Sequence, residues 1–256
     1  MRYVLLFFIL LTLHVKAADY SVEVGGFMPS FKGDIENPSS TVKYSDDLNY
    51  ESTLISYFGF NANFDTYYIP NVSIDYFNMI DSQNAVFDSP KELVGMDFNG
   101  SVSTQTNYQV INLVLHKNFY KPGVYFDLFG DQYYTGDLYF KLGVNLKNID
   151  YEFQIKQNDN PTSPNPYEFI TVNSNVILPH FGVLYRLYDL TLFGQGSALA
   201  IGDIRANSFK VGADYRLLHY IAVSAGFLYE DFQATEIKDK VTFIASGGYM
   251  SIKVFF

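Results

Sequence analysis

Residues 138–147 read LYFKLGVNLK and alternate between large apolar side chains and polar or small ones. One face of this stretch carries Leu138, Phe140, Leu142, Val144 and Leu146. The other face carries Tyr139, Lys141, Gly143, Asn145 and Lys147. Such period-two alternation is typical of a β-strand whose two faces meet different surroundings. Because strands that separate lipid from a barrel lumen alternate over roughly ten residues, the stretch predicts a strand of a transmembrane β-barrel.

Segments with the same alternation recur along the rest of the chain. The expected strands lie near residues 20–31, 52–64, 72–79, 105–116, 138–147, 169–186, 190–201, 209–217, 221–229 and 249–256. Single-chain bacterial barrels have an even number of strands. We therefore predict an all-β fold, a closed antiparallel transmembrane β-barrel of about ten strands, with eight or twelve strands as the open alternatives.

The connections between these strands alternate in length, as barrels with long outer loops and short periplasmic turns require. Residues 32–51, 80–104 and 156–168 are polar and are expected to form long outer loops. Residues 187–189 and 218–219 are expected to form tight turns on the periplasmic side.

Two features disturb this regular plan. The apolar phase of residues 138–147 shifts after Lys147 to Ile149, Tyr151 and Phe153, which predicts a β-bulge. The connection 117–136 is too long for a periplasmic turn. It either contains an extra short strand or helix around residues 124–129, or shows that the strand count is wrong.

The N-terminus carries the pattern of a secretory signal peptide. Arg2 precedes an apolar run over Tyr3–Leu13, and Val15 and Ala17 fit a cleavage site after residue 17. The run is shorter than the roughly 20 residues of a spanning helix, which argues against a membrane anchor. The predicted domains are a signal peptide, residues 1–17, and an outer-membrane barrel domain, residues 18–256. The predicted location is the cell outer membrane.

Composition excludes several classes of protein. The formal net charge of −10 becomes −12 once Arg2 and Lys16 are removed with residues 1–17, and nucleic-acid binding needs clustered basic residues instead. The chain has no cysteine, which excludes a disulfide framework and a thiolate metal site. We therefore expect no nucleic-acid partner.

The C-terminus and two internal stretches resemble a known group of proteins. The last strand ends in alternating apolar residues, namely Met250, Ile252, Val254 and Phe256. Together with residues 68–76 and 178–249, it resembles the family of small Gram-negative outer-membrane β-barrel proteins of unassigned function. The resemblance implies a fold and a location, and no catalytic residue. A terminal aromatic residue of this kind implies recognition by the barrel-assembly machinery, and the other expected partners are outer-membrane lipid and lipopolysaccharide.

Charged residues on the polar strand faces are the candidate site, because in a barrel those faces point inward. They are Glu23, Asp75, Lys141, Lys147, Asp214, Arg216 and Lys253. They could line a narrow charged pore or pair with one another and fill the lumen. Barrels of eight strands are largely filled by side chains, so about ten strands favour a filled lumen.

Catalysis would require a histidine next to an acid or a serine. We interpret His116, His180 and His219 as interfacial or turn residues, with His116 and His219 at or near the periplasmic rim and His180 a few residues above it. We predict no catalytic residue, metal site or cofactor. The predicted function is that of an integral outer-membrane protein with a structural or surface-exposed role. A narrow passive pore for small solutes is a further option within this prediction. The alternatives are a barrel enzyme acting on lipid or peptide, and a soluble secreted β-protein that binds a ligand.

Overall fold

The computed structural model of the chain describes residues 19–64, 68–93, 95–128, 131–158, 167–201, 204–236 and 239–256. The predicted signal peptide, residues 1–17, lies outside the described residues. No helix among the described residues is long and apolar enough to cross a membrane.

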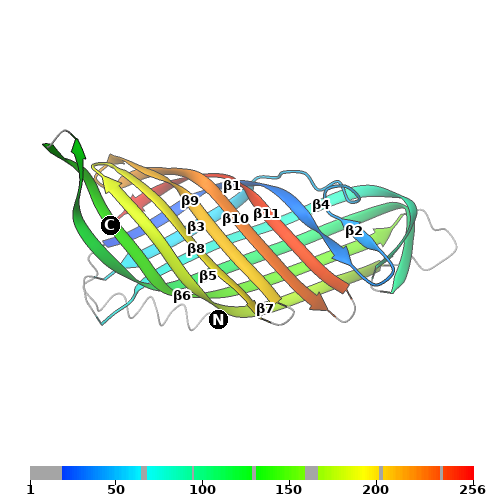
Figure 1. Cartoon of the computed structure of the whole chain (residues 1–256). Coiled ribbons are helices and arrows are strands. Elements are labelled where there is room, and N and C mark those ends of the chain that lie inside the picture. Colours follow the sequence, from blue (N-terminus) through cyan, green and yellow to red (C-terminus); the bar gives the residue numbers. More distant parts are fainter. Residues whose placement is uncertain are drawn as a thin grey trace.

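The strands form a closed antiparallel ring (Figure 1). In chain order the strands of the ring are β1 (Asp19–Glu36), β3 (Ile55–Asn63), β4 (Asn71–Leu93), β5 (Met96–Leu128), β6 (Asp131–Gln157), β7 (Tyr167–Leu187), β8 (Leu190–Ile201), β9 (Ile204–Leu218), β10 (Ile221–Glu236) and β11 (Asp239–Phe255). Each strand pairs with its neighbour in the chain, and β11 pairs with β1 to close the ring. A short strand, β2 (Thr41–Lys43), adds to β1 outside this order. The predicted fold of about ten strands is confirmed.

The two ends of the barrel are named from the positions of the chain termini. One end, which we call the terminal end, holds the start of β1 and the finish of β11, and the opposite end is the distal end. Both predicted tight turns are confirmed at the terminal end, between Leu187 and Leu190 and between Leu218 and Ile221. Tyr188 adopts a positive φ of 52° in the first of these turns.

The outward strand faces near the terminal end carry a band of exposed apolar side chains, which we call the apolar belt. Its members include Val24, Phe58, Leu142, Phe181, Val211, Phe227 and Ile252. On β6 the belt covers residues 138–146, and Leu142 at its centre is 56% exposed. A tilted strand crosses a hydrocarbon layer in roughly 9–11 residues, so the belt has the height of a lipid-facing surface.

On the distal side of the belt, the inward-facing side chains become apolar and the outward-facing side chains become polar. On β6, Asn148 and Asp150 follow on the outward face, while Ile149 and Tyr151 are fully buried on the same inward face as Lys147. The pairing of β6 with β5 and β7 is continuous through these residues, so the predicted β-bulge after Lys147 is wrong. The apolar phase shifts because the distal half of the barrel is filled with apolar side chains and its wall is polar.

The same exchange explains why the long outer loops were overpredicted. β4 continues to Leu93 and β5 starts at Met96, so most of the expected loop 80–104 is a long hairpin. Residues 32–36 continue β1, and residues 41–43 form β2. The polar side chains on these strands face outward. From the sequence pattern alone, such polar stretches are predicted to be loops.

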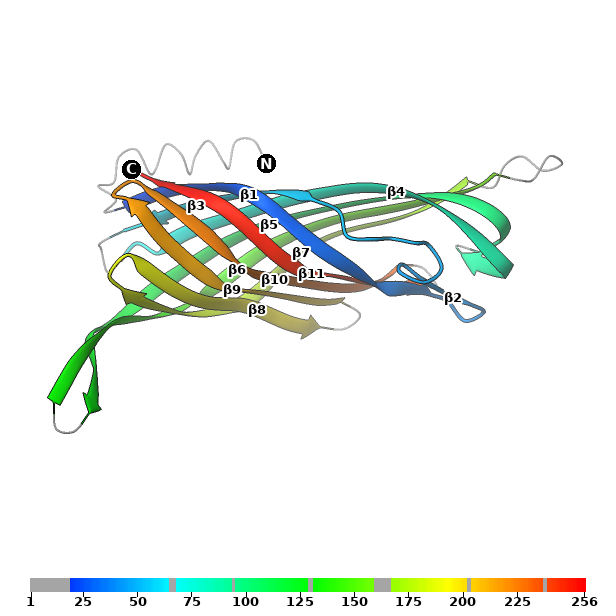
Figure 2. The same ribbon diagram turned by 90° about the horizontal axis from the view of Figure 1, so that it is seen from above.

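The long connection 117–136 is not an extra barrel strand. It extends β5 and β6 into a hairpin that projects beyond the terminal end of the barrel (Figure 2). Beyond His116, β5 has no partner in β4, and β6 pairs with β7 only from Asp137 onward. The strand count is therefore unaffected by this insertion.

Arginine substitutions on β6 test where lipid meets the barrel. We expect Leu142→Arg to lower the free energy of unfolding by about 2–4 kcal/mol, because charge on the lipid face is most destabilising at the midplane. The matched substitution Asn148→Arg, on the same face but above the belt, should cost roughly 0–1 kcal/mol. Urea unfolding of both variants in lipid vesicles measures the difference. Equal stability of the two variants would show that the belt does not face lipid.

Candidate functional site: the barrel lumen

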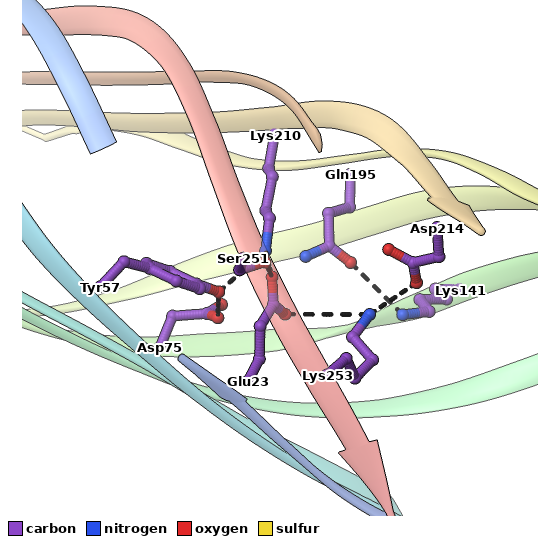
Figure 3. A network of polar contacts seen from close by, with 9 residues as sticks. All are labelled: Glu23, Tyr57, Asp75, Lys141, Gln195, Lys210, Asp214, Ser251 and Lys253. Carbon is purple, nitrogen blue, oxygen red and sulfur yellow. Dashed lines mark hydrogen bonds and ion pairs between the residues drawn. The ribbon is translucent and has the colours of Figure 1, made fainter. Parts of the chain in front are cut away.

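The seven predicted charged residues lie on strand faces that point into the lumen. Glu23 and Lys147 are almost completely buried there. The remaining positions are Asp75 on β4, Lys141 on β6, Asp214 and Arg216 on β9, and Lys253 on β11. Five of the seven, all except Lys147 and Arg216, appear in one polar cluster (Figure 3).

We call this cluster the central network. The Lys210 ammonium lies 3.4 Å from a Glu23 carboxylate oxygen and donates a hydrogen bond to the Tyr57 hydroxyl at 2.8 Å. The Tyr57 hydroxyl in turn donates to Asp75. Ser251 donates its hydroxyl to Glu23. Buried Glu23 and partly buried Asp75 therefore each have a donor, which limits the cost of removing them from water.

The central network crosses the lumen from wall to wall. Lys210 belongs to β9, whereas Glu23 and Tyr57 belong to β1 and β3, and two strands separate β9 from β1 around the ring. Lys253 lies between Glu23, at 3.8 Å, and Asp214, at 2.5 Å, and extends the network toward the terminal end (Figure 3). These contacts place side chains across the middle of the lumen.

A second buried ion pair joins β6 to β10. The Lys147 ammonium donates to the Glu230 carboxylate, and the side chains are 0% and 1% exposed. Desolvating two charges costs several kcal/mol per ion, which a close, hydrogen-bonded contact must offset. Lys147 has this partner because the two side chains meet inside the ring, although β6 and β10 are not neighbouring strands.

Two histidines face each other in the lumen over a glycine. His116, Gly143 and His180 occupy one row across β5, β6 and β7, and the two imidazole rings are 6.3 Å apart. A Cβ at Gly143 would lie 2.8 Å from His116 Cβ, so this row needs glycine. His180 Nδ1 is 2.9 Å from Ser197 Oγ. The interpretation of His116 and His180 as interfacial residues is therefore wrong, and His219 lies in the turn as expected.

The distal half of the lumen is filled by an aromatic cluster, which we call the distal plug. Phe243 lies at its centre, with ring centroids at 4.6 Å from Tyr108, 5.5 Å from Tyr44 and 5.7 Å from Phe31. Tyr44 comes from the segment after β2 and hydrogen-bonds the hydroxyl of Tyr151. Burial raises the pKa of the Tyr44 hydroxyl above its ordinary value, so it stays protonated.

The terminal end of the lumen is open and forms a cavity of about 700 Å³, which we call the vestibule. Its wall contains Asp19, Asn63, Asn71, Tyr120, Tyr139, Lys141, Arg186, Asp189, Arg216, Lys253 and Phe255, among others. Arg216 lies over the Phe255 ring, with 4.8 Å from Cζ to the ring centroid. The vestibule therefore starts at the strand ends and stops at the central network.

The same arrangement of strands occurs in a protein of known structure. Outer membrane protease OmpT from Escherichia coli aligns with a TM-score of 0.53 and 10% identity, covering 94% of this chain and 98% of that one. The translocator domain of autotransporter NalP from Neisseria meningitidis aligns with a TM-score of 0.45 and 11% identity, covering 99% of this chain and 94% of that one. No protein-family model and no curated protein matches the chain.

The chain has the fold of a Gram-negative outer-membrane β-barrel. Its apolar belt and closed ring agree with the predicted outer-membrane localisation. The predicted assembly residues Met250, Ile252, Val254 and Phe256 continue the outward face of β11. Their recognition by assembly machinery stays a prediction.

Several lumen residues were not singled out from the sequence. Glu230 and Tyr57 are the main examples, together with Gln195 and Ser251. Glu230 follows Tyr229, the last residue of a predicted outward face, so the same alternation places it inward. In the part of the chain that the structure describes, no three His, Asp or Glu side chains converge to hold a metal ion.

Proposed function

We propose that this chain is an integral outer-membrane barrel with a closed lumen, serving a structural or surface-exposed role and neither a channel nor an enzyme. The observation that carries the proposal is the central network, in which Lys210 reaches Glu23 across the lumen and Lys253 joins Glu23 to Asp214, so that lumen charges of opposite sign pair with one another. A wide selective channel would more naturally carry rings of one sign.

The orientation in the membrane follows from the two ends. Outer-membrane barrels have short turns on the periplasmic side and longer outer loops. At the terminal end β7 and β9 finish at Leu187 and Leu218, close to the belt, whereas β6 continues past the belt through residues 147–157 toward the distal end, so the longer extension lies on the distal side. The terminal end therefore faces the periplasm, and the distal plug closes the lumen toward the outside.

The expected partners suit this orientation. The distal wall above the belt is rich in amide and hydroxyl side chains, such as Asn84, Ser103, Gln105 and Gln154. In the proposed orientation this wall stands among the saccharides of lipopolysaccharide, whose hydroxyl groups such side chains can hydrogen-bond. The apolar belt, which lies on the periplasmic side of this wall, contacts the lipid chains.

Conductance measurements test the closed lumen. We expect low or undetectable conductance in planar bilayers, because both the distal plug and the central network lie in the path of an ion. Lys141→Glu should leave this result unchanged, since Lys141 donates to Gln195 and takes no part in the contacts of Lys210 that cross the lumen. Large, stable single-channel steps whose ion selectivity changes in Lys141→Glu would instead make the protein a porin.

Hydrolysis assays test the absence of catalysis. His180 and Ser197 are in contact, but among the described residues no carboxylate hydrogen-bonds His180, and both side chains are buried. A serine nucleophile needs a base that is itself oriented by a third group. We expect no esterase, phospholipase or peptidase activity that depends on His116, His180 or His219. Loss of such an activity in His180→Ala and in Ser197→Ala would favour the enzyme.

A further inference from the structure

The vestibule is a blind cavity with a preformed polar wall. The vestibule opens at the strand ends. The central network closes its inner end, where Lys253 and Asp214 form part of the vestibule wall. Its volume of about 700 Å³ falls in the range of roughly 300–1,000 Å³ that is usual for small-molecule sites. A cavity of this size that is closed at its inner end is suited to binding a molecule and not to transporting one.

The charges on this wall are unevenly paired. The basic residues of the wall are Lys117, Lys141, Arg186, Arg216 and Lys253, and the acidic residues are Asp19, Asp189 and Asp214. Asp214 is already engaged by Lys253. The wall thus has an excess of positive charge in a chain whose formal net charge is −10.

Three of these cations have no carboxylate within 4 Å in the described part of the chain. Lys141 donates to the amide oxygen of Gln195 at 3.3 Å. Arg186 lies over the Tyr139 ring at 5.4 Å, and Arg216 over Phe255 at 4.8 Å. Asp137, the residue opposite Arg186 in the sheet, attracts Arg186 from beyond 4 Å and accepts a hydrogen bond from the Gly123 amide at 3.0 Å.

The cation–π contacts hold the two guanidinium groups at the vestibule wall without using their N–H donors on a carboxylate. A guanidinium that rests its face on an aromatic ring keeps its five N–H donors at the edge, where they match carboxylate and phosphate oxygens. The ring also limits the rotamers that the side chain must lose on binding. A cleft with an excess of positive charge raises the local concentration of anions.

We infer that the vestibule binds a small anion that carries two or more carboxylate or phosphate groups. Arg186 and Arg216 hold its oxygens through their free edges, and Lys141 adds a third positive charge deeper in the cavity. In the proposed orientation such a ligand arrives from the periplasm. Binding in detergent solution does not depend on that orientation, so failure of the site and failure of the proposed function are distinguishable.

Calorimetric titration of the detergent-solubilised full chain tests the site. Citrate and pyrophosphate serve as carboxylate and phosphate probes, and glycerol as the uncharged control. We expect saturable binding of at least one anion, weakened about tenfold or more by Arg186→Gln and by Arg216→Gln, since a hydrogen bond to a charged group contributes about 1.5–3 kcal/mol. Lys240→Gln, which removes an exposed cation near the distal end, should bind as the parent does. No saturable binding, or equal weakening by Lys240→Gln, would overturn the inference.

Thiol protection gives a second readout that leaves the arginines in place. The chain has no cysteine, so Thr191→Cys in the vestibule and Ser82→Cys on the distal wall are each unique thiols. The anion that binds in the titration should slow maleimide labelling of Thr191→Cys and leave labelling of Ser82→Cys unchanged. Equal labelling rates at position 191 with and without the anion would place binding elsewhere and overturn the inference.

Discussion

Lys147→Met is expected to lower the free energy of unfolding by about 3–5 kcal/mol, because it leaves the Glu230 carboxylate buried without its cation. Both side chains are essentially inaccessible, so water cannot replace the lost partner. Glu230→Leu should be destabilising for the same reason, since it strands the Lys147 ammonium. Urea titration in lipid vesicles, followed by the gel shift between folded and unfolded protein, measures each loss.

The double variant Lys147→Met/Glu230→Leu separates the buried charge from the packing. Replacing a whole buried ion pair by apolar residues of similar volume is often neutral or stabilising. We therefore expect the double variant to recover most of the stability that either single variant loses. If the double variant loses as much unfolding free energy as the two single variants together, the ion pair itself stabilises the contact between β6 and β10. The cost would then not come from an unpaired buried charge.

The terminal half of the barrel was predictable because its two faces differ sharply. Leu142 and Val144 face out and Lys141 faces in, as the period of two requires. The turns near residues 188 and 219 were predictable because each interrupts the alternation for only a few residues. Strand number then followed from counting these alternating segments.

The distal half was harder to predict because the pattern reverses there. At Ile149 and Phe153 an inward position becomes apolar, and at Asn148 an outward position becomes polar. A pattern search that assumes lipid along the whole strand reads this reversal as a bulge or a loop. The physical cause is the height of the barrel, since its wall above the belt meets a polar medium and encloses an apolar plug.

The lumen site was only half predictable. Alternation placed Glu23 and Asp75 inward, but it carries no information about partners across the ring. Lys210 meets Tyr57 only because the sheet closes on itself, and the two residues are 153 positions apart in the chain. Pairing of this kind depends on the tilt and register of the closed barrel.

Phe243→Ala is the second substitution with a large expected effect, because Phe243 is at the centre of the distal plug. It is fully buried, and its ring contacts those of Tyr108, Tyr44, Phe31 and Tyr151. Truncating a buried phenylalanine to alanine removes its transfer free energy and leaves a cavity, at a cost of about 3–5 kcal/mol. Thr242→Ala, the preceding residue on the outward face, should change stability by no more than about 0.5 kcal/mol.

Conductance of the same variant distinguishes the two closures of the lumen. In Phe243→Ala the distal plug is loosened, but Lys210 still reaches Glu23 and Tyr57 across the middle of the barrel. We therefore expect Phe243→Ala to remain non-conducting in planar bilayers while its unfolding midpoint falls. Adding Lys210→Ala removes the cross-lumen contact as well, and only this double variant should admit ions. Conductance in Phe243→Ala alone would show that the aromatic plug is the sole barrier and that the central network serves stability and not closure.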